Sequence, residues 1–344
     1  MQASPPTDVT PASLMRTALT VLATIASETE PLGAKFAAAG HELALVGGPV
    51  RDAFLGRRSA DLDFATNATP AQTEAILAEW AETTWDVGRE FGTIAARRGD
   101  VIVEITTYRT ESYDATSRKP SVAFGDTLEG DLSRRDFRVN AMAVRLPDLT
   151  FVDPFNGLAD LAAGVINTPA SPQQSFDDDP LRILRAARFS AQLGLDVDPA
   201  VMTAMTQYAP RLEIVSAERV QTELVKTLMA PAPRRGIELL VETGVMDVVV
   251  PEGPAMRLEI DEHHRHKDVY THSLTVLDQA IGLETGPDGE VPGPDLVLRL
   301  AALLHDIGKP DTRRNEDGGR VSFHHHEIVG AKLARKRLKA LKFD

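Results

Sequence analysis

The chain has 344 residues, of which 43% are hydrophobic, and a formal net charge of −13 at neutral pH. This much apolar material is enough for two or three packed units and excludes a mainly disordered or low-complexity protein. The chain has no cysteine, which excludes disulfides and thiolate metal sites. No apolar run approaches the roughly 18 residues that a membrane-spanning helix needs. Because the N-terminus also lacks a basic segment followed by an apolar core, we expect a cytoplasmic location.

The first 40 residues are expected to form an N-terminal extension. Residues 1–13 are rich in Pro, Ser and Thr, which is typical of disorder. Residues 14–40 are expected to form one or two leading helices before the first compact domain.

A glycine turn follows a short apolar run. Residues 43–46 (Leu-Ala-Leu-Val) predict a buried strand, Gly47 and Gly48 a tight turn, and Pro49 the first residue of a helix that runs toward Leu55. Free backbone N–H groups at such a helix start suit a triphosphate, and Arg51, one turn in, adds guanidinium donors.

The next predicted strand carries two carboxylates. Asp61 and Asp63 are two residues apart, so they project from one face of a strand, about 7 Å apart along the chain. Hard oxygen ligands suit Mg²⁺, and two metal ions can activate an attacking 3′-hydroxyl and stabilise a pyrophosphate leaving group. Glu104, in the alternating stretch Val-Ile-Val-Glu-Ile-Thr, is the candidate third carboxylate, because it would lie on the face opposite Val103 and Ile105. A Gly-Gly turn or an Asp-x-Asp pair alone is common, but their order here is restrictive.

Five ordered segments resemble one family. They are residues 45–63, 134–141 (Arg-Arg-Asp-Phe-Arg-Val-Asn-Ala), 153–161 (Asp-Pro-Phe-Asn-Gly-Leu-Ala-Asp-Leu), 178–189 (beginning Asp-Asp-Pro-Leu-Arg) and 218–224 (Glu-Arg-Val-Gln-Thr-Glu-Leu). In order and spacing the chain resembles the class II tRNA nucleotidyltransferases, which are CCA-adding enzymes, and the related bacterial poly(A) polymerases. The resemblance covers roughly residues 40–344.

We therefore expect an α+β protein. Residues 41–165 would form a nucleotidyltransferase head with a small mixed or antiparallel sheet and helices, and the polar stretch 111–131 would be a loop. Residues 166–257 would form an all-α neck that binds nucleotide and RNA, and residues 260–344 an all-α HD domain.

The resemblance implies that CTP and ATP are joined to the 3′ end of tRNA as C, C and A, with Mg²⁺ on Asp61 and Asp63. It also implies a set of nucleotide-binding residues: Gly47, Gly48, Arg51, Arg135, Asp136, Asp179, Arg182, Arg185 and Arg188. Within this set Asp179 and Arg182 would read the pairing edge of C and A, with the protein as template, because both bases present an amino donor beside a ring-nitrogen acceptor. Capping of a helix by Asp before Pro180 is the simpler explanation of Asp179. Poly(A) polymerase is the alternative activity, and Phe91-Gly92-Thr93 favours the CCA-adding branch.

A second signal lies in the C-terminal part, which holds eight of the nine histidines. His272, His305 and Asp306 resemble the ligands of an HD phosphohydrolase metal, either a transition metal or Mg²⁺, and His324 to His326 offer a further ligand. The family's later metal-binding Asp would lie beyond Asp344, so we expect a truncated HD domain. An HD-type phosphohydrolase with a nucleotide-binding head is the alternative from a different class.

RNA binding by an acidic chain requires local positive charge. The candidates are Arg134, Arg135 and Arg138, the arginine stripe from Arg182, the pair Arg234 and Arg235, and six basic residues between Lys332 and Lys342. The alternative for the last group is an ordinary solvated helix face.

Overall fold

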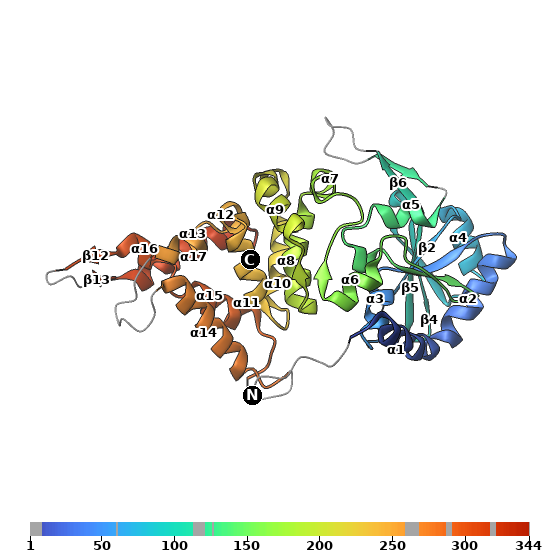
Figure 1. Ribbon diagram of the computed structural model, residues 1–344, viewed down its shortest axis with the longest axis horizontal. Helices are drawn as coiled ribbons and strands as arrows, with labels where there is room; N and C mark the ends of the chain where they lie inside the picture. The colour runs from blue at the N-terminus through green and yellow to red at the C-terminus, as the bar shows by residue number, and fades with distance from the viewer. Residues whose placement is uncertain are drawn as a thin grey trace. The chain divides into compact units, whose positions relative to one another are not determined.

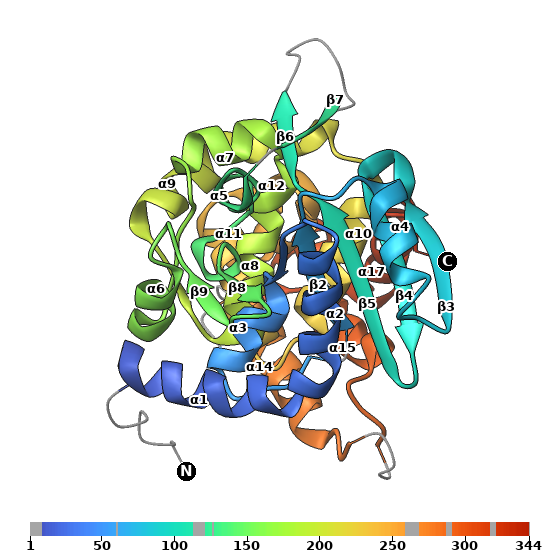
Figure 2. The ribbon, with the colours of Figure 1, turned by 90° about the vertical axis from the view of Figure 1, so that its right-hand side faces the viewer.

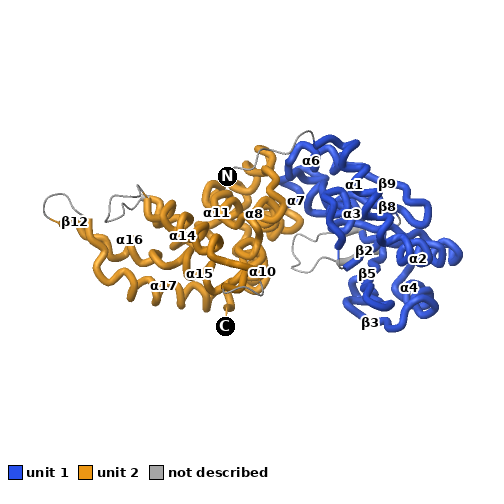
Figure 3. The backbone as a smooth tube through the Cα atoms, turned by 90° about the horizontal axis from the view of Figure 1, so that it is seen from below, with its two compact units in different colours: residues 1–175 blue, residues 176–344 orange. Residues whose placement is uncertain are grey.

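The computed structural model describes residues 9–59, 61–112, 121–125, 127–258, 268–286, 291–316 and 321–343. The chain divides into two compact units, residues 1–175 and residues 176–344 (Figure 3). Most of the predicted neck therefore shares a unit with the predicted HD domain, whose expected start at residue 260 lies outside the described residues.

Two helices, α1 (Pro11–Thr24) and α2 (Ala26–Ala38), precede the sheet. Thr10 caps α1, since its hydroxyl accepts the N–H of Ser13 while the Ser13 hydroxyl accepts the N–H of Thr10. This reciprocal cap, with proline at the first helical position, starts the helix at Pro11. The expectation of disorder was therefore wrong for residues 11–13, and residues 1–8 lie outside the described part of the chain.

The first unit is built on a seven-stranded sheet of order β3-β4-β5-β2-β1-β8-β9. Its strands are β1 (Leu43–Val46), β2 (Asp61–Thr66), β3 (Thr83–Gly88), β4 (Thr93–Arg98), β5 (Val101–Thr107), β8 (Ala143–Leu146) and β9 (Thr150–Val152). Strands β2 and β5 are parallel and the other neighbours are antiparallel, which confirms the predicted mixed sheet.

The two faces of this sheet differ. Leu62, Val103 and Ile105 are almost fully buried on one face, and helix α4 (Pro70–Leu77) packs against β4 and β5 (Figure 2). On the other face Asp61 and Asp63 are exposed and Glu104 is half-buried. The alternation of β2 and β5 thus keeps the candidate carboxylates on an accessible surface.

The remaining elements of the first unit connect these strands. They are α3 (Gly48–Phe54), η1 (Arg89–Phe91), β6 (Arg109–Ser112), β7 (Ser121–Phe124), α5 (Leu128–Ser133), η2 (Arg138–Asn140), α6 (Gly157–Ala163) and β10 (Val165–Ile166). The expectation of a loop over residues 111–131 was partly wrong, because β6 pairs with β7 and Thr127 caps α5. Residues 113–120 and 126 lie outside the described part.

The second unit is mainly helical (Figure 1). Its elements, after α7 (Pro172–Asp178), are α8 (Leu181–Leu193), β11 (Asp196–Val197), α9 (Pro199–Tyr208), η3 (Ala209–Ile214), α10 (Ala217–Leu228), α11 (Pro233–Glu242), α12 (Val245–Val249), α13 (Glu252–Ala255), η4 (Met256–Leu258), α14 (Val269–Leu283), α15 (Leu296–Leu304), α16 (Lys309–Thr312), the short pair β12 (Arg314–Asn315) and β13 (Val321–Ser322), and α17 (His326–Ala340).

Close helix packing joins two helices of the neck segment, and a buried arginine joins the neck to the HD segment. A Cβ on Gly236 of α11 would lie 2.9 Å from the carbonyl oxygen of Ala187 in α8, so only glycine allows this crossing. Arg299 of α15 is buried, donates to the carbonyl oxygen of Leu228 at 2.6 Å and pairs with the carboxylate of Glu284. Among the described residues, no helix is both long enough and apolar enough to span a membrane.

Candidate active site

The turn between β1 and α3 requires glycine at its first position. Gly47 has φ +71° and ψ −128°, and a Cβ there would lie 2.6 Å from Nη1 of Arg135. Gly48 starts α3 with room around it, since a Cβ would meet Nη2 of Arg51 at an ordinary 3.7 Å. The predicted strand and turn are confirmed, the helix begins one residue earlier than predicted, at Gly48, and the 134–141 segment is brought against the turn.

A buried polar chain connects Arg51 to that segment. Nη1 of Arg51 donates to Oδ1 of Asn140 at 2.6 Å, and Nδ2 of Asn140 donates to Oδ1 of Asp136 at 2.9 Å. The same Asp136 oxygen accepts the backbone N–H of Phe137 at 2.8 Å. Asp136, predicted to bind nucleotide, here orients Asn140 and through it Arg51. The role of Asn140 was missed, because its partner stands 89 residues away in the sequence.

Two arginines of the same segment share one buried acid. Oδ1 of Asp131 accepts from Nη2 of Arg134 at 2.6 Å, and Oδ2 accepts from Nη2 of Arg135 at 3.1 Å. Burial alone would raise the pKa of Asp131, but the charges of Arg135 and Arg134 hold it below its usual value. Asp131 therefore fixes Arg135 beside Gly47. In the sequence, the only indication of this role of Asp131 is its spacing of three and four residues from Arg134 and Arg135.

Three carboxylates lie together on the open face of the sheet. In the parallel register Asp63 is the partner of Glu104 and Asp61 is the partner of Ile102, so Asp61, Asp63 and Glu104 share one face. Withdrawal of bulk water and the charges of Glu104 and Asp61 raise the pKa of Asp63 to about 6, although its side chain is still accessible. This mutual repulsion and the hard oxygen donors fit a divalent cation such as Mg²⁺.

The predicted base-reading residues lie at the start of α8. Oδ1 of Asp179 accepts the N–H of Leu181 at 3.1 Å, and Oδ2 accepts from Nη2 of Arg219 at 2.9 Å. Both the capping explanation and a fixed carboxylate thus apply to Asp179. Arg182 is buried and Arg185 half-buried. Arg219 lies in the 218–224 segment that carries the family resemblance, but no role was predicted for it.

Arg188, one of the predicted nucleotide-binding residues, forms a buried ion pair. Its Nε donates to Oε2 of Glu223 at 2.6 Å, and both side chains are at most 10% exposed. Its guanidinium also stacks over the ring of Phe189 at 4.1 Å. This buried pair ties α8 to α10, and the nucleotide contact of Arg188 stays a prediction.

The C-terminal histidines converge on Asp306. Nε2 of His305 lies 3.0 Å and Nε2 of His272 lies 3.7 Å from Oδ2 of Asp306, while Nε2 of His326 lies 3.4 Å from Oδ1. Among the described residues, His272, His305 and Asp306 form the one group of three such side chains whose ligand atoms all lie within 4.8 Å of one another. The ligand atoms of Asp61, Asp63 and Glu104 in the head do not all lie within 4.8 Å of one another.

The geometry around Asp306 fits a metal ion. Nδ1 of His305 lies 2.9 Å from the carbonyl oxygen of Ala302, and Nδ1 of His326 lies 2.9 Å from that of Phe323, which leaves Nε2 of each ring as the ligand atom. Burial would raise the pKa of Asp306, but the hydrogen bond and charge of His305 and the ammonium of Lys309 lower it to about 2. A Cβ on Gly308 would lie 2.5 Å from the backbone nitrogen of Gly330, so α17 approaches closely and places His326 at the cluster.

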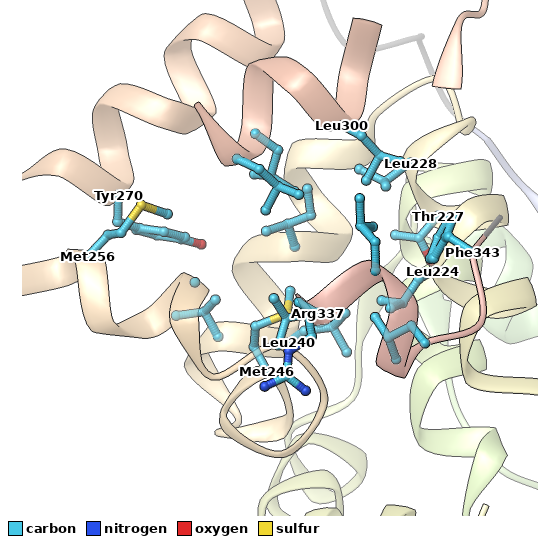
Figure 4. Close-up of a pocket in the computed structure, with 18 residues that line it drawn as sticks. Leu224, Thr227, Leu228, Leu240, Met246, Met256, Tyr270, Leu300, Arg337 and Phe343 are labelled. Atoms are coloured by element: carbon cyan, nitrogen blue, oxygen red, sulfur yellow. The ribbon is translucent and has the colours of Figure 1, made fainter. Parts of the chain in front are cut away.

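An apolar cavity of about 60 Å³ lies within the second unit (Figure 4). Its lining comes from α10 to α15 and α17 and includes Leu228, Met256, Leu300 and Tyr270, whose hydroxyl points into it. The Tyr270 hydroxyl makes no hydrogen bond with any described residue. The cavity is far smaller than the roughly 300 Å³ of a ligand pocket, so it is a packing defect and no nucleotide site.

Basic side chains form one exposed stripe on α17. Lys332, Arg335, Lys336 and Lys339 are exposed and follow helical spacing, whereas Arg337 pairs with Glu252 on another face. Arg234 pairs with Glu238 and Asp278, and Arg235 pairs with Asp196. The α17 stripe is therefore better suited to an external phosphate backbone than the Arg234–Arg235 pair.

Three protein families match successive parts of the chain. The family described as "Poly A polymerase head domain" matches residues 43–167, and "Probable RNA and SrmB-binding site of polymerase A" matches residues 194–256. The family described as "HD domain" matches residues 269–344. The first match contains the glycine turn and the three carboxylates, and the third contains the histidine cluster.

Curated relatives match about two thirds of the chain. The chain is 39% identical over 236 residues to the CCA-adding enzyme of Streptococcus gordonii, covering 68% of this chain and 58% of that protein. It is 36% identical over 252 residues to the CCA-adding enzyme of Levilactobacillus brevis, covering 72% of this chain and 62% of that protein. The matches thus span about three fifths of the length of these relatives.

Solved structures share the fold. A tRNA nucleotidyltransferase complexed with a primer tRNA and an incoming ATP analog is 25% identical, with a TM-score of 0.62 over 79% of this chain and 74% of that chain. The Bacillus stearothermophilus CCA-adding enzyme in complex with CTP is 27% identical, with a TM-score of 0.57 over 90% of this chain and 82% of that chain.

Proposed function

The chain belongs to the family of tRNA nucleotidyltransferases and poly(A) polymerases with a C-terminal HD domain, and we propose that it adds C, C and A to the 3′ end of tRNA from CTP and ATP. The observation that carries this proposal is the placement of Asp61, Asp63 and Glu104 on one open face of a sheet whose neighbouring turn is the Gly47–Gly48 turn. The names of the relatives support CCA addition over poly(A) synthesis, which is the second candidate.

In this reaction the triphosphate binds at the glycine turn. The turn brings backbone N–H groups close to the ligand, and Arg135 beside Gly47 and Arg51 beside Gly48 supply positive charge. Asn140 and Asp131 hold these two guanidinium groups in place. Such fixed donors stabilise negative charge that develops on the phosphates without reorganising during the reaction.

The carboxylates hold the metal. Mg²⁺ bound by Asp61 and Asp63, with Glu104 beside them, would act as a Lewis acid toward the attacking 3′-hydroxyl and the pyrophosphate. Glu104 raises the pKa of Asp63 through its charge, and we assign it the role of accepting the hydroxyl proton.

Base selection is assigned to Asp179 and Arg182. Two hydrogen bonds, from Leu181 and from Arg219, orient the Asp179 carboxylate and leave it capacity for the amino group of C or A. Arg182 would donate to the ring nitrogen beside that amino group. Uracil and guanine present the opposite pattern and would leave both residues unsatisfied.

The histidine cluster is a second metal centre with an HD-type ligand set. His272, His305, Asp306 and His326 combine imidazole and carboxylate donors, which suits a transition metal or Mg²⁺. A phosphohydrolase activity there is a second candidate function, independent of the head.

The test uses the purified chain with Mg²⁺ and tRNA that lacks its 3′ end. CTP alone should add two C residues, and CTP with ATP should add C, C and A. Asp61→Ala should abolish incorporation, while the exposed Asp100→Ala should not. A long tail from ATP alone would establish poly(A) synthesis instead, and incorporation that survives Asp61→Ala would contradict the assigned centre.

A further inference from the structure

The sheet register places an aromatic side chain in line with the carboxylates. Trp85 of the edge strand β3 is the partner of Ala95 in β4, Ala95 is the partner of Glu104 in β5, and Glu104 is the partner of Asp63 in β2. Register partners project from the same face of a sheet. Trp85 therefore lies on the open face that carries the candidate metal ligands, three strands from Asp63.

A second aromatic ring lies at the end of the same strand. Gly88 is the partner of Thr93, which is two residues from Ala95 and so points to the same face. A Cβ on Gly88 would lie 3.2 Å from the ring of Phe91, so this ring lies beside the end of β3. The two rings are 39% and 49% exposed, whereas Trp80, the other tryptophan, is 5% exposed and belongs to the core.

We propose that Trp85, flanked by Phe91, is a stacking platform for the last bases of the RNA strand that the head extends. This inference rests on the proposed nucleotidyl transfer and adds the path of the primer across the sheet. Nothing in the fold requires a large aromatic side chain on the solvent side of an edge strand, where it keeps apolar surface in water.

The distances suit a primer. Neighbouring strands are about 4.8 Å apart, so the Trp85 backbone lies on the order of 10 Å from that of Glu104 and 14 Å from that of Asp63. At about 3.4 Å per stacked base, this corresponds to roughly three or four nucleotides from the reacting 3′-hydroxyl.

Stacking also has the right selectivity. The strand advances by one nucleotide at each addition, so a contact upstream of the reacting end meets a different base each time. An aromatic face accepts every base, because each base has a π-face, whereas hydrogen-bond donors would discriminate among them. Base choice can then reside in the nucleotide site alone.

The kinetic test compares Trp85→Ala with Trp85→Phe, and uses Leu19→Ala as a control that also removes an exposed apolar side chain from the first unit. We expect Trp85→Ala to raise the KM for primer tRNA by about 10-fold while the KM for CTP stays unchanged, and Trp85→Phe to stay within about twofold of the wild type. An unchanged primer KM in an active Trp85→Ala enzyme would overturn the platform and leave the transferase assignment intact. An equal rise in the KM for CTP would place the ring at the nucleotide instead.

A binding measurement decides the question even without turnover. Trp80→Phe leaves Trp85 as the single tryptophan of the chain. We expect a short single-stranded RNA with a free 3′-hydroxyl to quench its fluorescence, and Trp85→Ala to bind that RNA about 10-fold more weakly in a titration. RNA binding without quenching would contradict stacking. A wild-type chain that binds RNA with quenching but adds no nucleotide would refute the proposed function and not the platform.

Discussion

Glu104 and Asp63 are register partners in the parallel strands β5 and β2, and both project from the open face of the sheet. Because they stand side by side, the charge of Glu104 contributes to the raised pKa of Asp63. The third carboxylate therefore influences the site electrostatically before any metal binds.

Glu104→Gln should weaken catalysis without unfolding the head. The amide keeps the shape of the side chain but removes the negative charge beside Asp63 and the carboxylate assigned to accept the hydroxyl proton. We expect kcat to fall by about 100-fold, as for loss of a general base, with an unchanged melting temperature. Glu104→Asp should retain part of the activity, and a Glu104→Gln enzyme with wild-type kcat would remove Glu104 from the site.

Mg²⁺ binding to the head should depend on pH, with a midpoint near the pKa of Asp63. Protons compete with the metal, and burial and the neighbouring carboxylates raise the pKa of Asp63 from its ordinary value of 3.8 to about 6 in the folded, metal-free protein. Since the folded-state pKa is raised, the metal-free protein should lose stability as the pH rises from about 4 to 6. Mg²⁺ should therefore raise the melting temperature at pH 8 and lose this effect below pH 6.

Asp63→Asn is the matched variant for that titration. The amide cannot ionise, so both the pH dependence of the metal-free protein and the Mg²⁺-dependent stabilisation should disappear. Differential scanning calorimetry at several pH values measures both. Persistence of the pH 4 to 6 slope in Asp63→Asn would assign it to another group.

Gly47→Ala should be damaging where Gly48→Ala is tolerated. Gly47 has a positive φ, and its Cβ would meet Arg135 at 2.6 Å, whereas the nearest atom to a Cβ on Gly48 is 3.7 Å away. We expect Gly47→Ala to destabilise the head by about 1–3 kcal/mol and to weaken CTP binding through displacement of Arg135. Chemical denaturation and CTP titration of the two variants provide the comparison, and equal stability of both would mean that the turn relaxes.

Tyr270→Phe should stabilise the second unit. The hydroxyl is buried at the apolar cavity without a hydrogen bond to any described residue, and such a group costs about 1–3 kcal/mol. We expect a melting temperature higher by about 2–4 °C per kcal/mol gained. Tyr108→Phe is the contrast, because the Tyr108 hydroxyl donates to Oε2 of Glu42 at 3.0 Å and its loss should destabilise. A destabilised Tyr270→Phe would indicate a bound water as partner.

Local signals were sufficient for the head. The strand at 43–46, the turn at Gly47 and the placement of Asp61, Asp63 and Glu104 follow from short-range periodicity and from the special backbone of glycine and proline. The helix α5 was missed because its signal is one Thr127 cap within a polar stretch.

Long-range partners could not be predicted in the same way. The sequence gives no sign that Arg188 pairs with Glu223 or that Arg51 reaches Asn140, since these partners are 35 and 89 residues apart. Likewise, the sequence alone does not distinguish which of His324, His325 and His326 faces the cluster. Only the close approach of Gly308 to Gly330 selects His326 as the one that faces Asp306.

His326→Ala should therefore weaken metal binding at the HD-type cluster, while His324→Ala should not. His324 and His326 are two residues apart, but His324 is exposed and His326 lies 3.4 Å from Asp306 with its Nε2 toward the cluster. Loss of one imidazole ligand should reduce Mn²⁺ or Ni²⁺ affinity by about 10- to 100-fold, as loss of ligand support does at other sites. Isothermal titration of both variants measures this, with Asp61→Ala in the background so that the head binds no competing metal. Equal affinities would show that His272, His305 and Asp306 hold the ion alone, and His326 would then be left to contact a substrate.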